Sequence, residues 1–308
     1  MVFLITLSIL SLLFHSLHLP GLWMQIATNA QVLCIQKVPS ADFHDFIASL
    51  VCGKDLSNST QLSVLLSTQL YHLAVVSGGH LQILLELLEI FVAKTTFGGL
   101  IITALLILFS TFTGLQAPVT RSLFVFLFNR FHLKLKIKSR PDLVQLISGT
   151  LCLLLFPDWI YSYSLFLSWW AGLSLCLSSQ LFPSSKKQNP YSWKKNLCRV
   201  GLVQISTGLA LGIFSGIGIV ANWLIAPTFS FLLFPIGLLS LMVPQFSIIF
   251  DFISTFFFFL LSSLNKLDDL TLSFEGLPKM GLTPWFCLAL FTLLVRLIAI
   301  HQARKKCF

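Results

Sequence analysis

The sequence predicts an all-α polytopic integral membrane protein with about ten transmembrane or partly re-entrant helices. Of its 308 residues, 56% are hydrophobic and only 10% are charged, whereas a soluble domain has about 25% charged residues. Apolar runs close to the roughly 20 residues needed to cross a bilayer recur along the chain. Runs such as "FFFFLL" and "LCLLLF" lack the alternation of a membrane barrel. The spans are therefore expected to be helices, whose backbone hydrogen bonds are satisfied internally.

The predicted spans follow one another with mostly short connections. We place them at 2–19, 80–96, 97–116, 118–132, 142–156, 158–181, 200–220, 222–243, 245–264 and 284–302. The first is interpreted as a retained span and not as a signal peptide, because no basic region precedes its apolar run. Several segments are short for a full crossing, and 118–132 is a candidate for a broken or re-entrant helix.

Three basic clusters determine the predicted topology. They are Lys134, Lys136, Lys138 and Arg140; Lys186, Lys187, Lys194, Lys195 and Arg199; and Arg304, Lys305 and Lys306. Basic residues collect in cytoplasmic loops, and an even number of predicted spans separates each cluster from the next. The N-terminus and the C-terminus are therefore both expected in the cytoplasm, with 20–79 outside. The net charge of +9 is explained first by this topology, before any contact with nucleic acid.

The seven cysteines show no CxxC pair and no Cys/His cluster, so the spacing of zinc ligands is absent. Cys34 and Cys52 fall in the predicted outside segment, where oxidation is permitted, and a disulfide between them is possible. The other cysteines are expected to be reduced packing residues. We expect neither a metal nor a cofactor.

Ionisable residues inside spans are costly, so each is a functional candidate. Glu86 and Glu89 lie three residues apart on one helical face. We expect them to form, with His80 and Gln82, a polar stripe that faces the protein interior or water. Arg121 is the intramembrane cation, and the two glutamates could pair with it as structural support. The other intramembrane polar candidate is Asn222, and His72 and His80 could either cap broken helices or line a pore.

Catalytic motifs give little support for an enzyme. Ser77 and His80 could form a serine–histidine pair, but Ser-x-x-His on one short segment is a poor way to position the base. The chain contains no HExxH and no P-loop. We expect a protein that is not an enzyme and that has no ATPase of its own.

At "YHLAVVSGGHLQILL" the sequence resembles the ComEC-type competence proteins, the membrane DNA channels of natural transformation. Their membrane domain carries a stretch similar to H-L-L-A-I-S-G-L-H-V-G-L, which His72, Leu73, Ala74, Ser77, Gly78 and His80 match. "LVCGKDL" precedes it as in the family. "TGLQAPVTRS", with Gly114 and Arg121, follows. The next stretch is "RPDLVQLISGTLCLLLFPDWIYSYSLFLSWWAG", with Pro157, Leu167, Ser168 and Ala171. The last is "ANWLIAPTFSFLLFPIGLLS", with Asn222, Pro227, Pro235 and Gly237. The resemblance runs from about 46 to 245.

The chain also departs from the family pattern. Gly79 stands where leucine is usual, Gln82 where glycine is usual, and Pro118 replaces the serine before the arginine; Ser164 and Phe166 replace a glycine and a glutamine. The outside OB-fold domain of full-length relatives is not expected, because 20–61 is too short for a five-stranded barrel. No H-x-H-x-D-H motif of their metallo-β-lactamase-like domain occurs. Nuclease chemistry is therefore expected from a separate protein.

The resemblance implies a multi-pass channel of the bacterial cytoplasmic (inner) membrane that takes up single-stranded DNA. We expect 1–19 to be the first transmembrane helix and 20–61 a short extracytoplasmic segment. The channel core would be 62–245, and 246–308 would hold the C-terminal helices and a basic cytoplasmic tail. The predicted DNA path comprises His72, Ser77, Gly78, His80, Arg121, Ser168 and Asn222, with Tyr71, Trp169 and Trp170 as candidate stacking surfaces.

The expected partners are single-stranded DNA, membrane lipid, a cytoplasmic helicase or motor, an outside DNA receptor and a separate nuclease. Two other functions stay open. Glu86, Glu89, His80 and Arg121 are residue types used by ion- or proton-coupled small-solute transporters. A degenerate paralogue that only assists assembly is the third reading.

Overall fold

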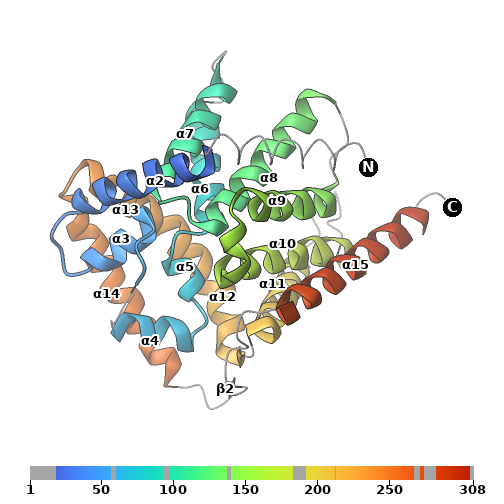
Figure 1. Ribbon diagram of the computed structural model, residues 1–308. Helices are drawn as coiled ribbons and strands as arrows, with labels where there is room; N and C mark the ends of the chain where they lie inside the picture. Colours follow the sequence, from blue (N-terminus) through green and yellow to red (C-terminus); the bar gives the residue numbers. More distant parts are fainter. Residues whose placement is uncertain are drawn as a thin grey trace.

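The protein is a bundle of helices with one small two-stranded sheet (Figure 1). The computed structural model describes residues 19–56, 60–92, 97–136, 140–182, 192–211, 213–266, 271–273 and 282–305. The N-terminal half contains α2 (Leu19–Gln36), α3 (His44–Cys52), α4 (Thr60–Ser67), α5 (Tyr71–Ala74), α6 (Gly78–Val92), α7 (Gly98–Phe112) and α8 (Ala117–Lys134). Next come α9 (Pro141–Leu155), the 3₁₀-helix η1 (Pro157–Tyr161), α10 (Tyr163–Leu181) and α11 (Ser192–Leu211).

The C-terminal part contains the sheet and the most apolar helices. Its elements are β1 (Ile213–Ser215), α12 (Gly216–Thr228), the π-helix η2 (Phe229–Leu233), α13 (Phe234–Met242), α14 (Phe246–Asn265), β2 (Thr271–Ser273) and α15 (Leu282–Lys305). The strands β1 and β2 pair antiparallel, with Phe214 opposite Leu272.

Among the described residues, two helical runs are long and apolar enough to cross a bilayer, Gly218–Met242 and Phe246–Leu264. Three shorter apolar helices accompany them, Gly98–Phe112, Pro141–Leu155 and Pro284–Ile298. This is the helical, membrane-type architecture that the composition predicts, whereas the count of ten spans and the cytoplasmic termini stay predictions. The predicted first span, 2–19, lies outside the described residues except for its last position.

Helix positions agree with the predicted spans in most of the chain but differ in three places. The segment 118–132, a candidate for a broken helix, is the continuous helix α8. The predicted span 200–220 is divided between α11 and α12, with β1 between them. The outside segment contains the helices α2 and α3, which the sequence did not suggest because polar residues interrupt the apolar run of α2.

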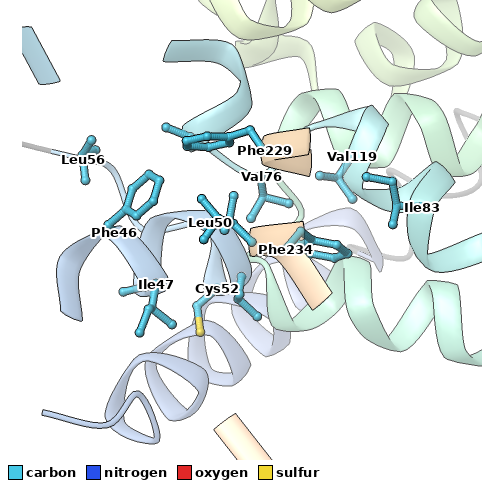
Figure 2. Close-up of a cluster of buried hydrophobic side chains, with 14 of the residues drawn as sticks. Phe46, Ile47, Leu50, Cys52, Leu56, Val76, Ile83, Val119, Phe229 and Phe234 are labelled. Carbon is cyan, nitrogen blue, oxygen red and sulfur yellow. The ribbon is translucent and has the colours of Figure 1, made fainter. Parts of the chain in front are cut away.

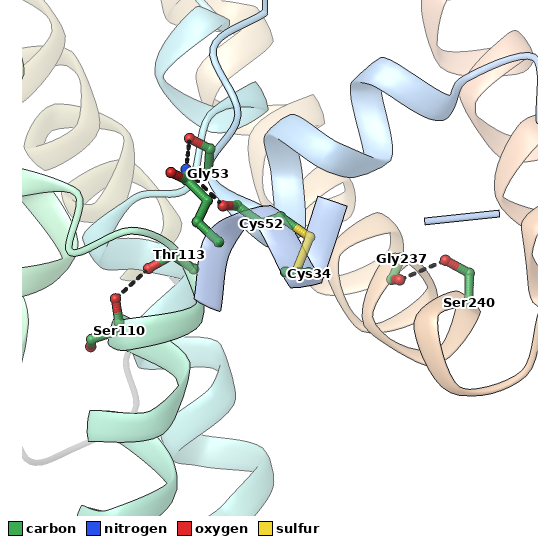
Figure 3. The surroundings of a disulfide bond; sticks show 8 residues. Cys34, Cys52, Gly53, Ser110, Thr113, Gly237 and Ser240 are labelled. Carbon is green, nitrogen blue, oxygen red and sulfur yellow. Dashed lines mark hydrogen bonds between the residues drawn. A yellow bond between two sulfur atoms is a disulfide. The ribbon is translucent and has the colours of Figure 1, made fainter. Parts of the chain in front are cut away.

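The disulfide predicted as possible is formed. Cys34 of α2 and Cys52 at the end of α3 are bonded, with their Cα atoms 5.7 Å apart (Figure 3). The amide of Gln31 donates to the carbonyls of Cys52 and Gly53, at 3.1 and 2.8 Å. One covalent bond and two hydrogen bonds therefore attach α2 to the end of α3.

The largest core joins the N-terminal helices to the broken apolar run of α12, η2 and α13. Phe46 of α3, Phe229 of η2, Phe234 of α13 and Phe250 of α14 are fully buried in it. Figure 2 shows Phe46, Phe229 and Phe234 among the aliphatic side chains of this cluster. Large aromatic side chains dominate the burial energy of such a core. They also place η2 beside α3 and α6.

A second core lies between α10 and α15, around Phe166, Trp169 and Leu288. The helices α9, α10 and α15 run side by side in Figure 1. The beginning of α9 and the ends of α10 and α15 point to the side where the C-terminus lies. The membrane side on which the basic clusters lie stays a prediction, and Lys138, Lys186, Lys187 and Lys306 fall outside the described residues.

Candidate functional site

The segment Ser77–His80 forms the start of helix α6, and the His80 side chain caps it. His80 Nδ1 accepts a hydrogen bond from the backbone N–H of Ser77 at 3.0 Å, and Ser77 Oγ lies 3.3 Å from the same nitrogen. The imidazole acts as the residue three positions after an N-cap does in a capping box. Because Nδ1 is already the acceptor of the backbone hydrogen bond, this pair caps a helix and is not arranged as a nucleophile and its base.

Gly78 allows the start of α6 to approach α8 closely. A Cβ atom at Gly78 would lie 2.1 Å from Ser122 Oγ and 3.1 Å from Ser122 Cβ. At Gly79, by contrast, the nearest atom to a Cβ would be Ser77 Oγ at 3.4 Å. Only the first of the two glycines is therefore required by packing.

The second ring nitrogen of His80 has no hydrogen-bond partner in the described part of the chain. The residue is 1% exposed, and Nε2 is buried without a hydrogen bond among the residues that the structure describes. Since Nδ1 accepts, the hydrogen-bond network assigns the proton of the neutral ring to Nε2. The ring packs against Phe234 of α13, with centroids 4.8 Å apart. His80 therefore presents a buried donor beside the broken span.

The expected polar stripe of α6 is wrong in one respect. His80 is buried, whereas Gln82, Glu86 and Glu89 are exposed on the opposite side of the helix. At 100° per residue, position 80 lies about 160° from position 82, so the four side chains cannot share a face. Gln82 Nε2 donates to Glu86 Oε1 at 3.1 Å. The two carboxylates thus do not join His80 in a relay.

Arg121 lies between α8, α9 and α10. Its side chain is buried, 6% exposed, and Nε donates to Ser168 Oγ of α10 at 3.0 Å. Its Nη1 donates to Gln145 Oε1 of α9. A Cβ at Gly172 would meet both Gln145 Oε1 at 2.4 Å and Arg121 Nη1 at 3.1 Å, so this glycine leaves room for the pair. The predicted site residues Arg121 and Ser168 are in direct contact.

Arg121 has no carboxylate partner within the described part of the chain. The suggested pairing with Glu86 or Glu89 is not formed, because these side chains lie on the outer side of α6. The buried ion pair of this region is a different one, from Arg296 Nη1 of α15 to Asp142 Oδ2 of α9 at 2.5 Å. Sequence reasoning missed this pair, although both residues fall inside predicted spans.

A second polar contact connects the segment before α5 with α11 and α12. The Gln69 carbonyl lies 3.0 Å from His72 Nδ1, and Gln69 Oε1 accepts from Gln204 Nε2. A Cβ at Gly218 would lie 2.6 Å from Gln69 Oε1, and the Gly218 carbonyl accepts from Asn222 Nδ2 at 2.9 Å. His72 and Asn222 are thus brought into one neighbourhood by two glutamines that the sequence did not single out.

The candidate stacking residues of α10 are packed against neighbouring helices. Trp169 lies on Gly149, where a Cβ would be 2.3 Å from the indole. Trp170 stacks on Phe291 of α15, with centroids 4.6 Å apart and planes at 16°. Both rings serve the second core in this state. Tyr71 is half-buried at the start of α5.

The stretch "LVCGKDL" forms the C-terminal end of α3 and the turn after it. Gly53 has φ +72°, a left-handed conformation that favours glycine, and its carbonyl accepts from Gln116 Nε2 at 3.0 Å. Lys54 Nζ lies 2.7 Å from Asp45 Oδ1. The hydrogen bond from Lys54, together with His44, lowers the pKa of the Asp45 carboxyl below its usual value. Gly114, with φ +70°, packs on Gln31, so two stretches of the resemblance meet here.

The model of the competence protein family matches residues 50–304. The chain belongs to this competence protein family. The match covers most of the sequence and extends beyond the stretches that suggested the resemblance, through α14 and α15. No curated protein and no solved structure matches the chain. Membership associates this membrane protein with competence, the uptake of DNA, and the contacts of Arg121 and of His80 lie within the matched residues.

Proposed function

We propose that this competence-family protein is a membrane conduit that passes single-stranded DNA into the cytoplasm. A DNA strand is a polyanion with one phosphate per nucleotide, and its phosphates cannot cross hydrocarbon without polar partners. A conduit for it needs donor groups within the helical bundle and no fixed negative charge along the path. The contacts of Arg121 with Ser168 and Gln145, which join α8, α10 and α9, have this character.

The guanidinium of Arg121 is the observation that carries the proposal. A buried cation is costly when no opposite charge accompanies it, and an arginine within a membrane helix normally has a functional role. Here Ser168 Oγ and Gln145 Oε1 hold the group with neutral oxygens. A passing phosphate would supply the missing counter-charge through the bidentate geometry that guanidinium groups favour.

Neutral partners also suit transport better than a permanent ion pair. A carboxylate on Arg121 would compete with each phosphate, whereas two neutral acceptors keep the side chain oriented and leave its charge unbalanced. Conduction requires contacts that are strong enough for entry and weak enough for release. The glutamates of α6 lie on the outer side of that helix and do not reach Arg121, so they do not repel phosphate at this position.

The chain is proposed to conduct DNA without cutting it. Ser77 and His80 form a helix cap, and among the described residues no group of three or more metal-ligating side chains occurs. The proposed partners are those expected from the resemblance: an outside DNA receptor, a cytoplasmic helicase or motor that pulls the strand, and a nuclease on another chain.

The test is uptake of labelled DNA into the nuclease-protected cytoplasmic fraction of a deletion strain complemented with the full chain. We expect Arg121→Gln to reduce uptake strongly and Arg121→Lys to keep part of it, because lysine retains the charge without the bidentate fork. Arg130→Gln is the matched control on α8. Its guanidinium lies over the Phe126 ring at 5.9 Å, and we expect normal uptake.

Protein level in the membrane is measured for each variant, so that loss of uptake is separated from loss of folding. Undiminished uptake with Arg121→Gln at normal protein level contradicts the role of the arginine. Undiminished uptake in the deletion strain itself, with no second competence-family protein present, contradicts the proposed function. Solute flux in liposomes that ignores added oligonucleotide would favour the transporter reading.

A further inference from the structure

The long apolar run Gly218–Met242 is not a regular α-helix. It consists of α12, the π-helical turn η2 and α13, and prolines lie on both sides of the turn, at Pro227 and Pro235. A proline has no N–H to donate, so each leaves a carbonyl of the preceding turn without its regular partner. Short π-helical turns and proline breaks are the usual places where a helix bends, and they occur frequently at functional sites.

The turn and the helix after it make different aromatic contacts, although α14 packs on both. Phe229, the first residue of η2, packs against Phe257 of α14, with centroids 5.3 Å apart. After it, Phe234 packs against His80 at 4.8 Å and against Phe109 of α7 at 5.7 Å. A bend at η2 would therefore move Phe234 relative to α6 and α7, while the contacts of Phe229 with α14 could stay in place.

The contact between Phe234 and His80 leaves hydrogen-bonding capacity unused. His80 Nε2 is a buried donor without a partner among the described residues. Pro235 follows Phe234 directly and deprives a carbonyl of the preceding turn of its ladder donor. An unmatched buried donor destabilises the arrangement that contains it. In the observed arrangement the aromatic packing is favourable, whereas the unsatisfied donor is unfavourable. Such opposed contributions are expected of an element that adopts two arrangements.

We propose that η2 is the hinge of a gate in the Gly218–Met242 span and that Phe234 against His80 and Phe109 is its closed contact. In the open arrangement α13 tilts at η2, Phe234 leaves the two rings, and His80 Nε2–H becomes free to donate to water or to the passing strand. The inference rests on the proposed DNA conduit, because it assigns to this span the step that admits the strand.

Cross-linking tests the gate in the full chain. In a background where every cysteine except Cys34 and Cys52 is replaced by alanine, Phe109→Cys/Phe234→Cys is cross-linked by a short bifunctional thiol reagent with a reducible linker. We expect DNA uptake to fall by about tenfold or more and to return on reduction, because the covalent link holds α13 against α7 and removes the open arrangement from the equilibrium. Phe229→Cys/Phe257→Cys, which links the first residue of η2 to α14, is the matched control and should leave uptake unchanged.

Two results of the cross-linking overturn the gate. One is normal uptake through the cross-linked Phe109→Cys/Phe234→Cys protein. The other is an equal block by both pairs, which indicates that any cross-link in this core stops the protein.

A measurement without DNA separates failure of the gate from failure of the conduit. Spin labels are placed at Met242 of α13 and Phe91 of α6, both 78% exposed. We expect two distance populations in the reconstituted protein and a shift between them with Phe234→Ala. One narrow population that this substitution does not change overturns the gate, whatever the uptake assay shows. Two populations in a protein that imports no DNA keep the gate and reject the conduit.

Discussion

Replacement of Gly78 by alanine tests the contact that positions the start of α6 against α8. The new Cβ would lie 2.1 Å from Ser122 Oγ and 3.1 Å from Ser122 Cβ. The hydroxyl can rotate away at a cost of about 1 kcal/mol, but the Cβ belongs to the backbone position of α8. The two helices must therefore separate by a few tenths of an ångström or more.

The magnitude follows from two opposed effects. Overpacking a close contact costs about 1–3 kcal/mol. Alanine is better than glycine in a helix by about 0.5–1 kcal/mol. The net destabilisation by Gly78→Ala is then about 1–2 kcal/mol. Gly79→Ala is the matched control: its Cβ meets nothing closer than 3.4 Å, so only the helix effect remains and we expect stabilisation by about 0.5–1 kcal/mol.

The assay is thermal unfolding of the detergent-solubilised full chain, followed by tryptophan fluorescence. A difference of about 2 kcal/mol between the two variants corresponds to a difference in Tm of about 4–8 °C. Gly78→Ala should also be partly rescued by Ser122→Ala, which removes the nearer atom, in a double-mutant cycle. Equal effects of the two glycine replacements, or strictly additive effects of the Gly78 and Ser122 replacements, would refute the close approach.

Three more predictions concern a disulfide bond, a left-handed turn and an ion pair. Replacing Cys34 and Cys52 by serine should lower the free energy of unfolding by about 3 kcal/mol, because the bond closes a loop between residues 18 apart. Thermal unfolding checks this, and a Tm equal to that of the wild type argues against it. Gly114→Ala should cost about 1–2 kcal/mol, because φ is +70°, and native-like stability of this variant would contradict the left-handed turn. Arg296→Gln leaves Asp142, which is 7% exposed, with the longer ion pair to Arg140 Nε at 3.8 Å, so adding Asp142→Asn should restore about 1–3 kcal/mol; a double variant less stable than Arg296→Gln alone would count against the contribution of the Arg296–Asp142 pair.

The membrane class, the helical architecture and the family could be predicted because they depend on properties that are local in sequence. A charged fraction of 10% and recurring apolar runs determine the solvent in which the chain folds. The ordered stretches around Ser77–His80 and Arg121 indicated the competence family, which the match over residues 50–304 confirms. The pairing of Cys34 with Cys52 was accessible because both fall in one predicted outside segment.

The partners of the polar residues could not be predicted, because they depend on how helices far apart in sequence are rotated against one another. Arg121 is held by Gln145 and Ser168, and not by Glu86 or Glu89. Asp142 finds Arg296 at a separation of 154 residues. The error about the polar stripe of α6 could have been avoided from the sequence. At 100° per residue, His80 lies on a different face of the helix from Glu86 and Glu89.

The sequence by itself determined that this protein is a helical membrane protein of the competence family. Solvation of the chain by the bilayer depends on runs of consecutive apolar residues, and the family motifs are likewise short stretches that follow one another along the chain. Only the tertiary structure decided that Arg121 has no carboxylate partner among the described residues, that Gly78 and not Gly79 is required at the α6–α8 contact, and that Phe234 lies on His80 beside a π-helical turn. Each of these depends on distances between separate helices, which are set by close packing of side chains and not by the composition of any one segment.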